Sequence, residues 1–381
     1  MTSPSVLAVA PTFNGHELMN IAIIGASGGV GRELAIQLVR DHTLENNETL
    51  QLIGGDPHSP HPHLLQGLRA DLLDAYSEIA PEIEVIDDLA AIRGDIVVMA
   101  AGLTFATSPG QISHASRDEL AANNLPIFER FARALASTTR SEPPLSIIVS
   151  NPVELGVHVF SEYQPREYVV GMGSHSDSLR FRAEIAADLG VRRQRVQGYI
   201  VGEHGAGMVP LWSSVRVAGM PELQRDSALE TRLQAIPPDQ FPARLTEGTK
   251  ELVAMLHDGG PDGPVRAYDY IAGLPPELRV ALRPIATHYT EAKTIVATAH
   301  ATLDLIRWIL QGRAVEVSAQ YQHRGEYGFE GPFGARVIMA GKVERLLPIE
   351  TYSPAELVLM RLSQAAIGGK SSNGAGEAIR S

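Results

Sequence analysis

Two short stretches of this chain hold a histidine, a carboxylate and an arginine, the side chains that acid–base chemistry on a bound acid requires. His204 lies in a Gly-Glu-His-Gly stretch, and Asp177 and Arg180 lie three residues apart upstream. A histidine that exchanges protons with a carbonyl needs a carboxylate to orient its ring. A guanidinium holds a substrate carboxylate through two parallel hydrogen bonds, which a lysine cannot reproduce. The three groups predict proton transfer on a small oxo or hydroxy acid.

A glycine-rich stretch near the start of the chain predicts a phosphate-binding loop. Residues 25–31, Gly-Ala-Ser-Gly-Gly-Val-Gly, follow the apolar run 21–24 and precede a helical pattern at 32–40. Glycines permit a tight turn and close approach to a pyrophosphate, and the helix N-terminus adds unpaired N–H groups. The alternative is a turn needed only for helix–strand packing. The residues expected to contact a dinucleotide here are Gly25, Ser27, Gly28, Gly29, Val30 and Gly31.

These groups must be positioned by an α/β fold. Short apolar runs typical of buried strands lie at 21–24, 50–53, 95–100 and 145–149, and helical patterns separate them, which predicts a doubly wound parallel sheet. Longer helical patterns follow residue 151, with a strand at 199–201. The expected division is a flexible N-terminal extension (1–18), a dinucleotide-binding domain (19–152), an α+β catalytic domain (153–366) and a flexible tail (367–381).

A segment rich in Gly, Pro and Asp at about 258–284 is expected to be an insertion beside the mouth of the site. Helical patterns at 245–256 and 287–310 flank it, and Gly-Gly-Pro and Pro-Pro sequences interrupt helices. We expect this insertion to close over a bound acid, to pack on a neighbouring subunit, or to be a passive loop. The side chains available for the first two roles are Arg266, Tyr268, Tyr270 and Arg279.

Composition excludes several classes of function. The formal net charge of −12 disfavours binding to nucleic acid and to anionic membranes. The chain has no cysteine, which excludes disulfides and thiolate metal sites and fits a reducing compartment. No apolar run reaches membrane-spanning length, and residues 1–14 lack the pattern of a secretory signal. We therefore expect a cytoplasmic protein that binds a small carboxylate and no metal.

Several motifs, in order along residues 20–365, resemble the lactate/malate dehydrogenase family. Their order makes the resemblance far more specific than a glycine fingerprint alone. The motifs are DIVVMAAG at 95–102, Pro-Gly at 109–110, Arg-Asp-Glu-Leu at 117–120, VSNPVE at 149–154, VVGMGSHSDSLRFR at 169–182 and VGEHGAGMVPLWS at 201–213.

The resemblance implies a Rossmann-type N-terminal domain, a nicotinamide cofactor and a role for each matching residue. His204 would be the acid–base group, Asp177 its orienting partner, Arg180 the ligand of the substrate carboxylate, and Arg117 the group that polarises the carbonyl. The cofactor is NAD or NADP, with NAD favoured, and the assembly is a homodimer or homotetramer. Asn151 would contact substrate or nicotinamide, and further expected cofactor contacts are Ala101, Gly102 and Asn124.

The chain departs from the family pattern where the family selects its substrate. Aligned on Pro109-Gly110, Thr107 occupies the position that is arginine in malate enzymes and glutamine in lactate enzymes. A threonine cannot pair with a second carboxylate, so oxaloacetate is disfavoured, and lactate is not supported either. The loop before Arg117 is also about four residues longer than in the family. Side chains that could then enter the pocket are His114, Ser116 and Arg140.

A second departure affects the choice of cofactor. The strand at 50–53 is followed by Gly54 where the family has an acidic residue for the adenosine ribose, and Asp56 could replace it from a shifted register. The histidines at 58, 61 and 63 follow in a Pro-rich stretch, which we interpret as a solvated loop and not as a metal site. Two other functions remain as alternatives, a non-catalytic dinucleotide-binding protein and a nicotinamide-dependent hydrolase on a related fold.

Overall fold

The computed structural model describes residues 19–54, 63–104, 117–138, 140–231, 236–258, 260–290 and 292–374. Within these ranges one mixed sheet runs through the molecule, in the order β3-β2-β1-β4-β5-β6-β9-β10-β7-β8, with β11 beside β10. The first six strands are parallel and have the order of a Rossmann-type sheet, which confirms the predicted α/β fold. They are β1 (Ile21–Ile24), β2 (Thr49–Ile53), β3 (Glu82–Ile86), β4 (Ile96–Met99), β5 (Leu145–Ile148) and β6 (Val169–Gly171).

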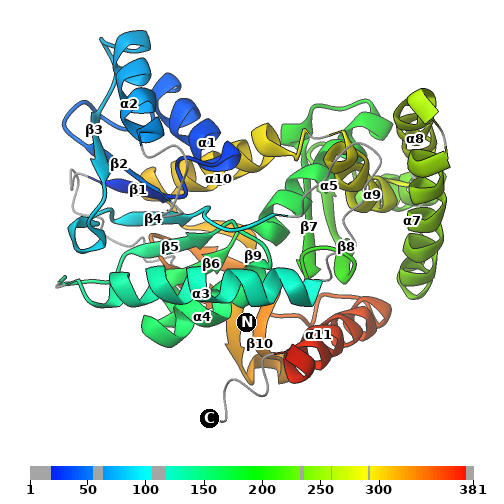
Figure 1. Ribbon diagram of the computed structural model, residues 1–381. Coiled ribbons are helices and arrows are strands. Elements are labelled where there is room, and N and C mark those ends of the chain that lie inside the picture. Colours follow the sequence, from blue (N-terminus) through cyan, green and yellow to red (C-terminus); the bar gives the residue numbers. More distant parts are fainter. Residues whose placement is uncertain are drawn as a thin grey trace.

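Helices cover both faces of this parallel sheet (Figure 1). Along β1, Ile21 and Ile23 join the hydrophobic core under α1 (Gly29–Arg40), α2 (Leu64–Ala75) and α10 (Ile295–Leu310). Ala22 and Ile24 join the core under α3 (Arg117–Ala136) and α4 (Val153–Tyr163). Because successive side chains of a strand point to opposite faces, a strand covered on both sides is a continuous apolar run, as the sequence predicted.

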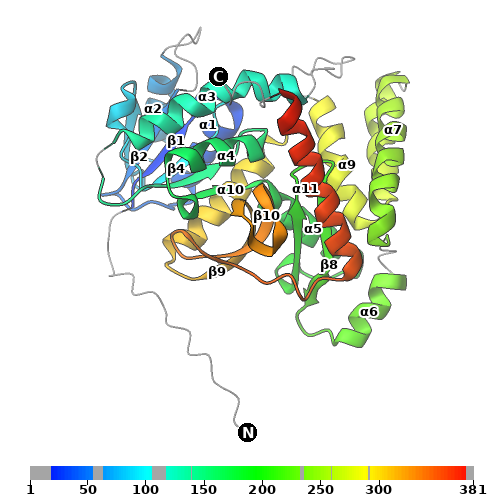
Figure 2. The ribbon, with the colours of Figure 1, turned by 90° about the horizontal axis from the view of Figure 1, so that it is seen from below.

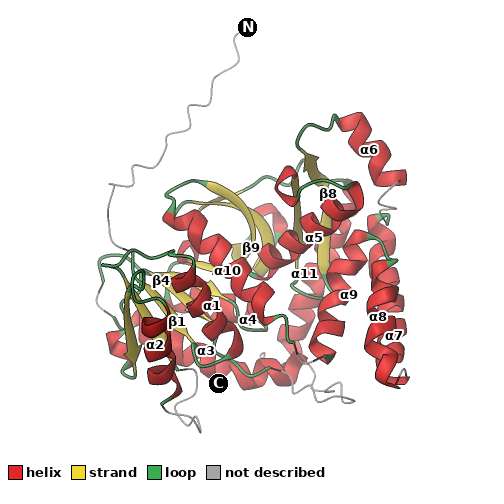
Figure 3. Ribbon diagram, turned by 90° about the horizontal axis from the view of Figure 1, so that it is seen from above, coloured by secondary structure: helices red, strands yellow, loops and turns green. Residues whose placement is uncertain are grey.

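The second half of the chain adds an antiparallel part of the sheet and its own core. The strands are β7 (Val196–Gly202), β8 (Met208–Val217), β9 (Val315–Arg324), β10 (Glu330–Met339) and β11 (Val343–Leu346). The helices are α5 (Gly173–Leu189), α6 (Glu222–Thr231), α7 (Phe241–Asp258), α8 (Gly263–Ala272), α9 (Pro276–Tyr289) and α11 (Pro354–Gly374). Figures 1 and 3 place α7 and α8 at the end of the molecule away from β1 and β2, and in Figure 2 α11 spans from β8 to α3.

The chain joins its two halves through α5, which begins two residues after β6 ends. Helix α5 packs on β7 and on α9, so one helix contacts both the antiparallel strands and the outer helices. Because Asp177 and Arg180 lie on its first two turns, the position of α5 fixes two of the three predicted site residues.

The segment that we expected to be an insertion at about 258–284 is mostly helical in its described residues. It contains the end of α7, a 3-10 turn at Gly260–Asp262, α8, and most of α9. Proline stands in the first turn of both α8 and α9, where its missing N–H costs nothing. The expected continuous helix at 287–310 is wrong, because α9 ends at Tyr289 and α10 begins at Ile295. Between them Lys293 and Thr294 both have φ near +51°, which breaks the helix.

A buried ion network anchors α9 to α5. Arg279 donates from Nε to Glu184 at 2.6 Å and from Nη2 to Asp188 at 2.6 Å, and Arg283 also pairs with Glu184. Arg279 is 6% exposed. The expectation that Arg279 closes over a substrate or packs on a neighbouring subunit is therefore wrong, because its guanidinium is consumed inside the protomer.

The C-terminal helix extends farther than the composition suggested. Helix α11 runs to Gly374, so regular backbone continues into the segment expected to be a flexible tail from residue 367. A helix already held by packing can continue through a few weak helix formers at its end. None of the helices in the described ranges has the length and apolarity needed to cross a membrane.

Glu277, at the start of α9, is a carboxyl group that the fold buries almost completely. Burial raises its pKa to about 7. The hydrogen bond that its Oε1 accepts from the Ile236 N–H at 2.6 Å lowers the pKa, but by less than burial raises it. A raised folded-state pKa means that the unfolded chain ionises first as the pH rises. We expect the free energy of unfolding to fall between pH 4.5 and 7 by about 3 kcal/mol from this group alone.

Glu277→Gln keeps an acceptor for the Ile236 N–H and removes the charge. Urea unfolding of this variant should show higher stability than wild type at pH 8 and equal or lower stability at pH 4.5. Glu247→Gln, on the exposed side of α7, is the matched control and should leave the pH dependence unchanged. Parallel stability curves for Glu277→Gln and wild type would contradict this assignment.

Candidate active site

The carboxyl ends of β1 and β4 form the crevice where a doubly wound sheet binds its ligand. Gly25 follows β1 with φ of +90°, and a Cβ there would lie 2.5 Å from the Ala101 nitrogen. Only glycine allows the two connections to pass this closely. The structure thus brings the predicted residues Gly25, Ala101 and Gly102 to the switch point of the sheet.

The loop at 25–31 has the features that an anionic group requires. Gly28 caps α1 without a side-chain hydrogen bond, and the first turn of α1 holds no acidic residue. The N–H groups and partial positive charge of the helix start are therefore left for an anion. A Cβ on Gly29 would lie 2.6 Å from Ile295, and one on Gly31 would collide with Gly25. The residues present fit a pyrophosphate, and Ser27 and Val30 lie in the same turn.

The end of β2 leaves open space where the family has an acidic side chain. Among the described residues, a Cβ on Gly54 would meet only the Leu65 side chain, at 4.0 Å. Asp56 lies outside the described residues, as do the histidines at 58 and 61. The expected contact between Asp56 and the adenosine ribose therefore stays a prediction.

Asn124 ties together two turns at the edge of the crevice. Its Nδ2 donates to Leu103 O at 3.0 Å and to Asn151 O at 2.6 Å, and its Oδ1 accepts from the Leu103 N–H at 2.7 Å. The side chain is fully buried on α3. We expected Asn124 to contact the cofactor directly. Instead its side-chain amide hydrogen-bonds main-chain atoms, and these bonds position Asn151 and the turn after Gly102.

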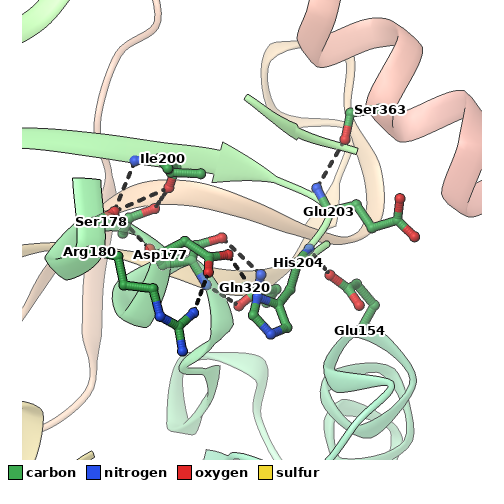
Figure 4. A network of polar contacts seen from close by, with 11 residues as sticks. Glu154, Asp177, Ser178, Arg180, Ile200, Glu203, His204, Gln320 and Ser363 are labelled. Carbon is green, nitrogen blue, oxygen red and sulfur yellow. Dashed lines mark hydrogen bonds and ion pairs between the residues drawn. The ribbon is translucent and has the colours of Figure 1, made fainter. Parts of the chain in front are cut away.

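His204 and Asp177 form the centre of the site (Figure 4). The His204 Nδ1 lies 2.7 Å from Asp177 Oδ2, and the Asp177 side chain is 2% exposed, whereas that of His204 is 24% exposed. Asp177 comes from α5 and His204 from the turn after β7. A carboxylate accepts only, so Nδ1 carries the proton, and Nε2 is the ring nitrogen that Asp177 does not contact.

Arg180 is the third member, one helical turn after Asp177. Its Nη1 donates to Asp177 Oδ1 at 2.9 Å, so one carboxylate pairs with both the imidazole and the guanidinium. The Arg180 side chain is 22% exposed. A guanidinium has five N–H groups in a planar fork, so this contact leaves donors for a ligand carboxylate.

The electrostatics of the pair favour a protonated imidazole beside an ionised carboxylate. Burial lowers the pKa of His204, but the charge and hydrogen bond of Asp177 outweigh it, and the pKa is raised above its ordinary 6.5. For Asp177 burial acts in the other direction and raises the pKa. The positive charges and hydrogen bonds of His204 and Arg180 outweigh burial, so the pKa of Asp177 is lowered. His288 at the end of α9 has a lowered pKa, through burial and the positive charges of Arg180, Lys293 and His204.

Three supporting residues were not anticipated from the sequence. A Cβ on Gly173 would lie 2.5 Å from His204 Cγ, so the start of α5 must be glycine for the imidazole to fit. Glu154 Oε1 accepts from the His204 N–H at 2.7 Å, and Ser363 Oγ accepts from the Glu203 N–H at 2.9 Å. No periodicity or spacing in the sequence links these distant residues to the turn that holds His204.

Some predicted site residues are not placed by the structure, and Arg140 lies elsewhere than expected. Thr107, His114 and Ser116 lie outside the described residues, and for Arg117 only the start of α3 is described. Arg140 does not enter the pocket. It donates to Ile92 O and Gly94 O near the amino end of β4.

Arg182 was interpreted as a surface or interface ion pair because it follows Arg180 by two residues on the same helix. Its Nε donates to Gly198 O at 2.9 Å, and its guanidinium lies 4.8 Å from the centre of the Tyr199 ring. The expected ion pair is therefore replaced by a cation–π contact on β7.

Family models match most of the chain. Residues 19–171 match the lactate/malate dehydrogenase NAD binding domain, and residues 175–254 match the lactate/malate dehydrogenase alpha/beta C-terminal domain. A curated relative, the L-2-hydroxycarboxylate dehydrogenase (NAD(P)(+)) of Methanocaldococcus jannaschii, is 32% identical over 263 residues, which are 65% of this chain and 75% of the relative. The L-lactate dehydrogenase of Zea mays is 34% identical over 56% of this chain and 57% of its own length.

Solved structures agree on the fold. Cryptosporidium parvum malate dehydrogenase has a TM-score of 0.71 at 20% identity, covering 94% of this chain and 100% of its own. The lactate dehydrogenase of the same organism, solved with lactic acid and nicotinamide adenine dinucleotide, has a TM-score of 0.70 at 22% identity, covering 94% and 98%.

The contact between Gly173 and His204 can be tested directly. Gly173→Ala should displace the imidazole and lower kcat/KM by at least about tenfold, which corresponds to about 1.4 kcal/mol. Affinity for the reduced cofactor, measured by fluorescence titration, should stay within about twofold, because the loop at 25–31 is untouched. Gly67→Ala on α2, where a Cβ meets none of the described residues within 4 Å, is the matched control. Full activity of Gly173→Ala would show that His204 is not held as described.

Proposed function

Because this chain belongs to the lactate/malate dehydrogenase family and is a nicotinamide-dependent 2-hydroxyacid oxidoreductase of that type, we propose that His204 is its acid–base group. The observation that carries the proposal is the 2.7 Å contact between His204 Nδ1 and the buried carboxylate of Asp177. It fixes the tautomer, orients the ring and supports the proton that the reaction transfers.

In the reducing direction, the protonated imidazole of His204 donates its Nε2 proton to the carbonyl oxygen of a 2-oxo acid. Asp177 stabilises the imidazolium before this transfer and holds the neutral ring in place after it. In the oxidising direction, neutral His204 accepts the hydroxyl proton of a 2-hydroxy acid, and Asp177 again stabilises the product imidazolium. The raised pKa of His204 favours the protonated imidazole that reduction needs.

The remaining residues bind and polarise the substrate in this proposal. Arg180 pairs with the substrate carboxylate through the donors that Asp177 does not use, and the same carboxylate of Asp177 keeps the guanidinium oriented. Arg117 and Asn151 donate to the carbonyl oxygen and stabilise the negative charge that develops there. Asn124 supports this arrangement by holding the main chain of Asn151.

The loop at 25–31 and the turn at Ala101-Gly102 hold the dinucleotide in this proposal. When bound, the nicotinamide cofactor supplies or accepts the hydride. We favour NAD over NADP because the sequence has no arginine between Gly54 and His63 to pair with a 2′-phosphate. Asp56, which follows β2 closely, is the residue that we assign to the ribose hydroxyls.

We propose a cytoplasmic homodimer or homotetramer. The absence of cysteine fits a reducing compartment, and the family resemblance supports the oligomer. A non-catalytic dinucleotide-binding protein has no need for the histidine, aspartate and arginine that contact one another here, so the catalytic function is preferred.

A panel of 2-oxo acids, each assayed with NADH and NADPH by nicotinamide absorbance, tests the function. We expect turnover with NADH, and in His204→Asn a loss of several powers of ten in kcat, because the proton donor is gone. Cofactor affinity should change little. An active His204→Asn enzyme would contradict the mechanism, and no turnover with any 2-oxo acid in the wild type would contradict the function.

The same panel tests the substrate class. If Thr107 takes the substrate-selecting position that the sequence pattern gives it, the second carboxylate of oxaloacetate has no cation to pair with there, and burying it unpaired costs several kcal/mol. We expect monocarboxylic 2-oxo acids to have the higher kcat/KM, and Thr107→Arg to raise kcat/KM for oxaloacetate specifically. Oxaloacetate as the best wild-type substrate by a wide margin would show that another residue supplies the missing charge.

A further inference from the structure

Glu154 is a buried acidic residue at the junction of two parts of the site. It lies in the first turn of α4, three residues after Asn151, and is 6% exposed. Its Oε1 accepts the main-chain N–H of His204 at 2.7 Å, across 50 residues of sequence (Figure 4). A side chain of the α4 turn therefore holds the residue that bears the imidazole.

An ionised carboxylate in this buried position costs free energy. Burying an ionised group away from water costs several kcal/mol, and a neutral amide donor offsets less of that cost than a cation would. A glutamine could accept the same N–H without a charge. The structure thus combines a hydrogen bond that any acceptor could make with a negative charge that only a carboxylate supplies.

The N–H of the preceding residue, Glu203, is also bound by a side chain, from a different helix. Ser363 on α11 accepts the Glu203 N–H at 2.9 Å and donates to Gly207 O at 2.6 Å. Consecutive N–H groups at residues 203 and 204 are therefore bound by side chains of α11 and α4. His204 is therefore held at two points. Glu154 binds its main-chain N–H, and Asp177 binds its imidazole at Nδ1.

We propose that Glu154 is a positioning residue for His204, which anchors the main chain of the histidine and keeps a second negative charge beside its imidazole. This inference rests on the proposed role of His204 and adds to it. Asp177 acts on the ring through a direct hydrogen bond, whereas Glu154 acts through the main chain and through space. Because Glu154 and Asn151 share one turn, the groups that contact substrate and the proton donor are also kept in register.

The charges around His204 come from three helices. Asp177 and Arg180 lie on α5, Glu154 on α4 and His288 on α9. The two carboxylates favour the imidazolium, and Arg180 opposes it. Glu203 is adjacent in sequence, but its carboxylate points to the opposite side of the turn in Figure 4. Among the described residues, Glu154 is thus a second carboxylate, beside Asp177, that raises the pKa of His204.

Two substitutions separate the anchor from the charge. Glu154→Gln keeps an acceptor and removes the charge, so the pKa of His204 should fall. Glu154→Ala removes both, and kcat should fall by roughly ten- to a hundredfold at every pH, because a hydrogen bond to a charged acceptor is lost. Glu162→Gln, on the exposed side of the same helix, is the matched control.

The measurement is an NMR titration of labelled histidine in the full-length protein, with the His204 signal assigned from His204→Asn. The pH dependence of kcat/KM for 2-oxo acid reduction is recorded beside it, and thermal unfolding checks the fold. A lower His204 pKa in Glu154→Gln, with the rate lost at correspondingly lower pH and kcat at low pH within about twofold of wild type, supports the proposal. Glu162→Gln should match wild type.

The two readouts distinguish failure of this inference from failure of the proposed function. An unchanged His204 titration in Glu154→Gln would overturn the inference even if the enzyme is fully active. A shifted titration with an unshifted rate profile would support the coupling of Glu154 to His204 and contradict the role of His204 as proton donor.

Discussion

The site depends on one buried carboxylate that two cations share. Asp177 is almost fully enclosed, yet its Oδ1 accepts from Arg180 and its Oδ2 from His204. Burial alone disfavours the ionised carboxylate, but His204 and Arg180 outweigh it and lower the pKa of Asp177, and the carboxylate in turn orients the imidazole and the guanidinium. The donor for a carbonyl oxygen and the ligand for a carboxylate thereby acquire a fixed geometry from a single side chain of α5.

The rest of the molecule places that side chain. Helix α5 starts at a glycine because the imidazole occupies the space of a Cβ, and its far end is held by Glu184, Asp188 and the arginines of α9. At the start of α4, Asn124 binds the main chain of Asn151. Glu154, in the first turn of α4, binds the main-chain N–H of His204. The parallel sheet and the antiparallel strands therefore meet at the site through side-chain contacts.

The sequence predicted what local patterns encode. The strand at 21–24, the glycine loop and the pairing of Asp177 with His204 depend on short motifs, and the topology and the contact distances agree with them. The break between α9 and α10 was missed because left-handed Lys293 and Thr294 carry no sequence signature. Arg279 and Arg140 were misplaced because an arginine that pairs internally is indistinguishable in sequence from one that waits for a ligand. Glu154 was missed because its partner is a main-chain N–H 50 residues away.

The central claim is that Asp177 sets the proton affinity of His204. Its most direct test is the pH dependence of kcat/KM for 2-oxo acid reduction in wild type and in Asp177→Asn. Reduction needs the protonated imidazole, so the wild-type rate should fall as the pH rises through a pKa above 6.5. In Asp177→Asn the direct hydrogen bond and the nearer negative charge are lost and Glu154 alone opposes burial, so the fall should move to lower pH, with a much lower plateau. An unchanged profile in Asp177→Asn would contradict the account.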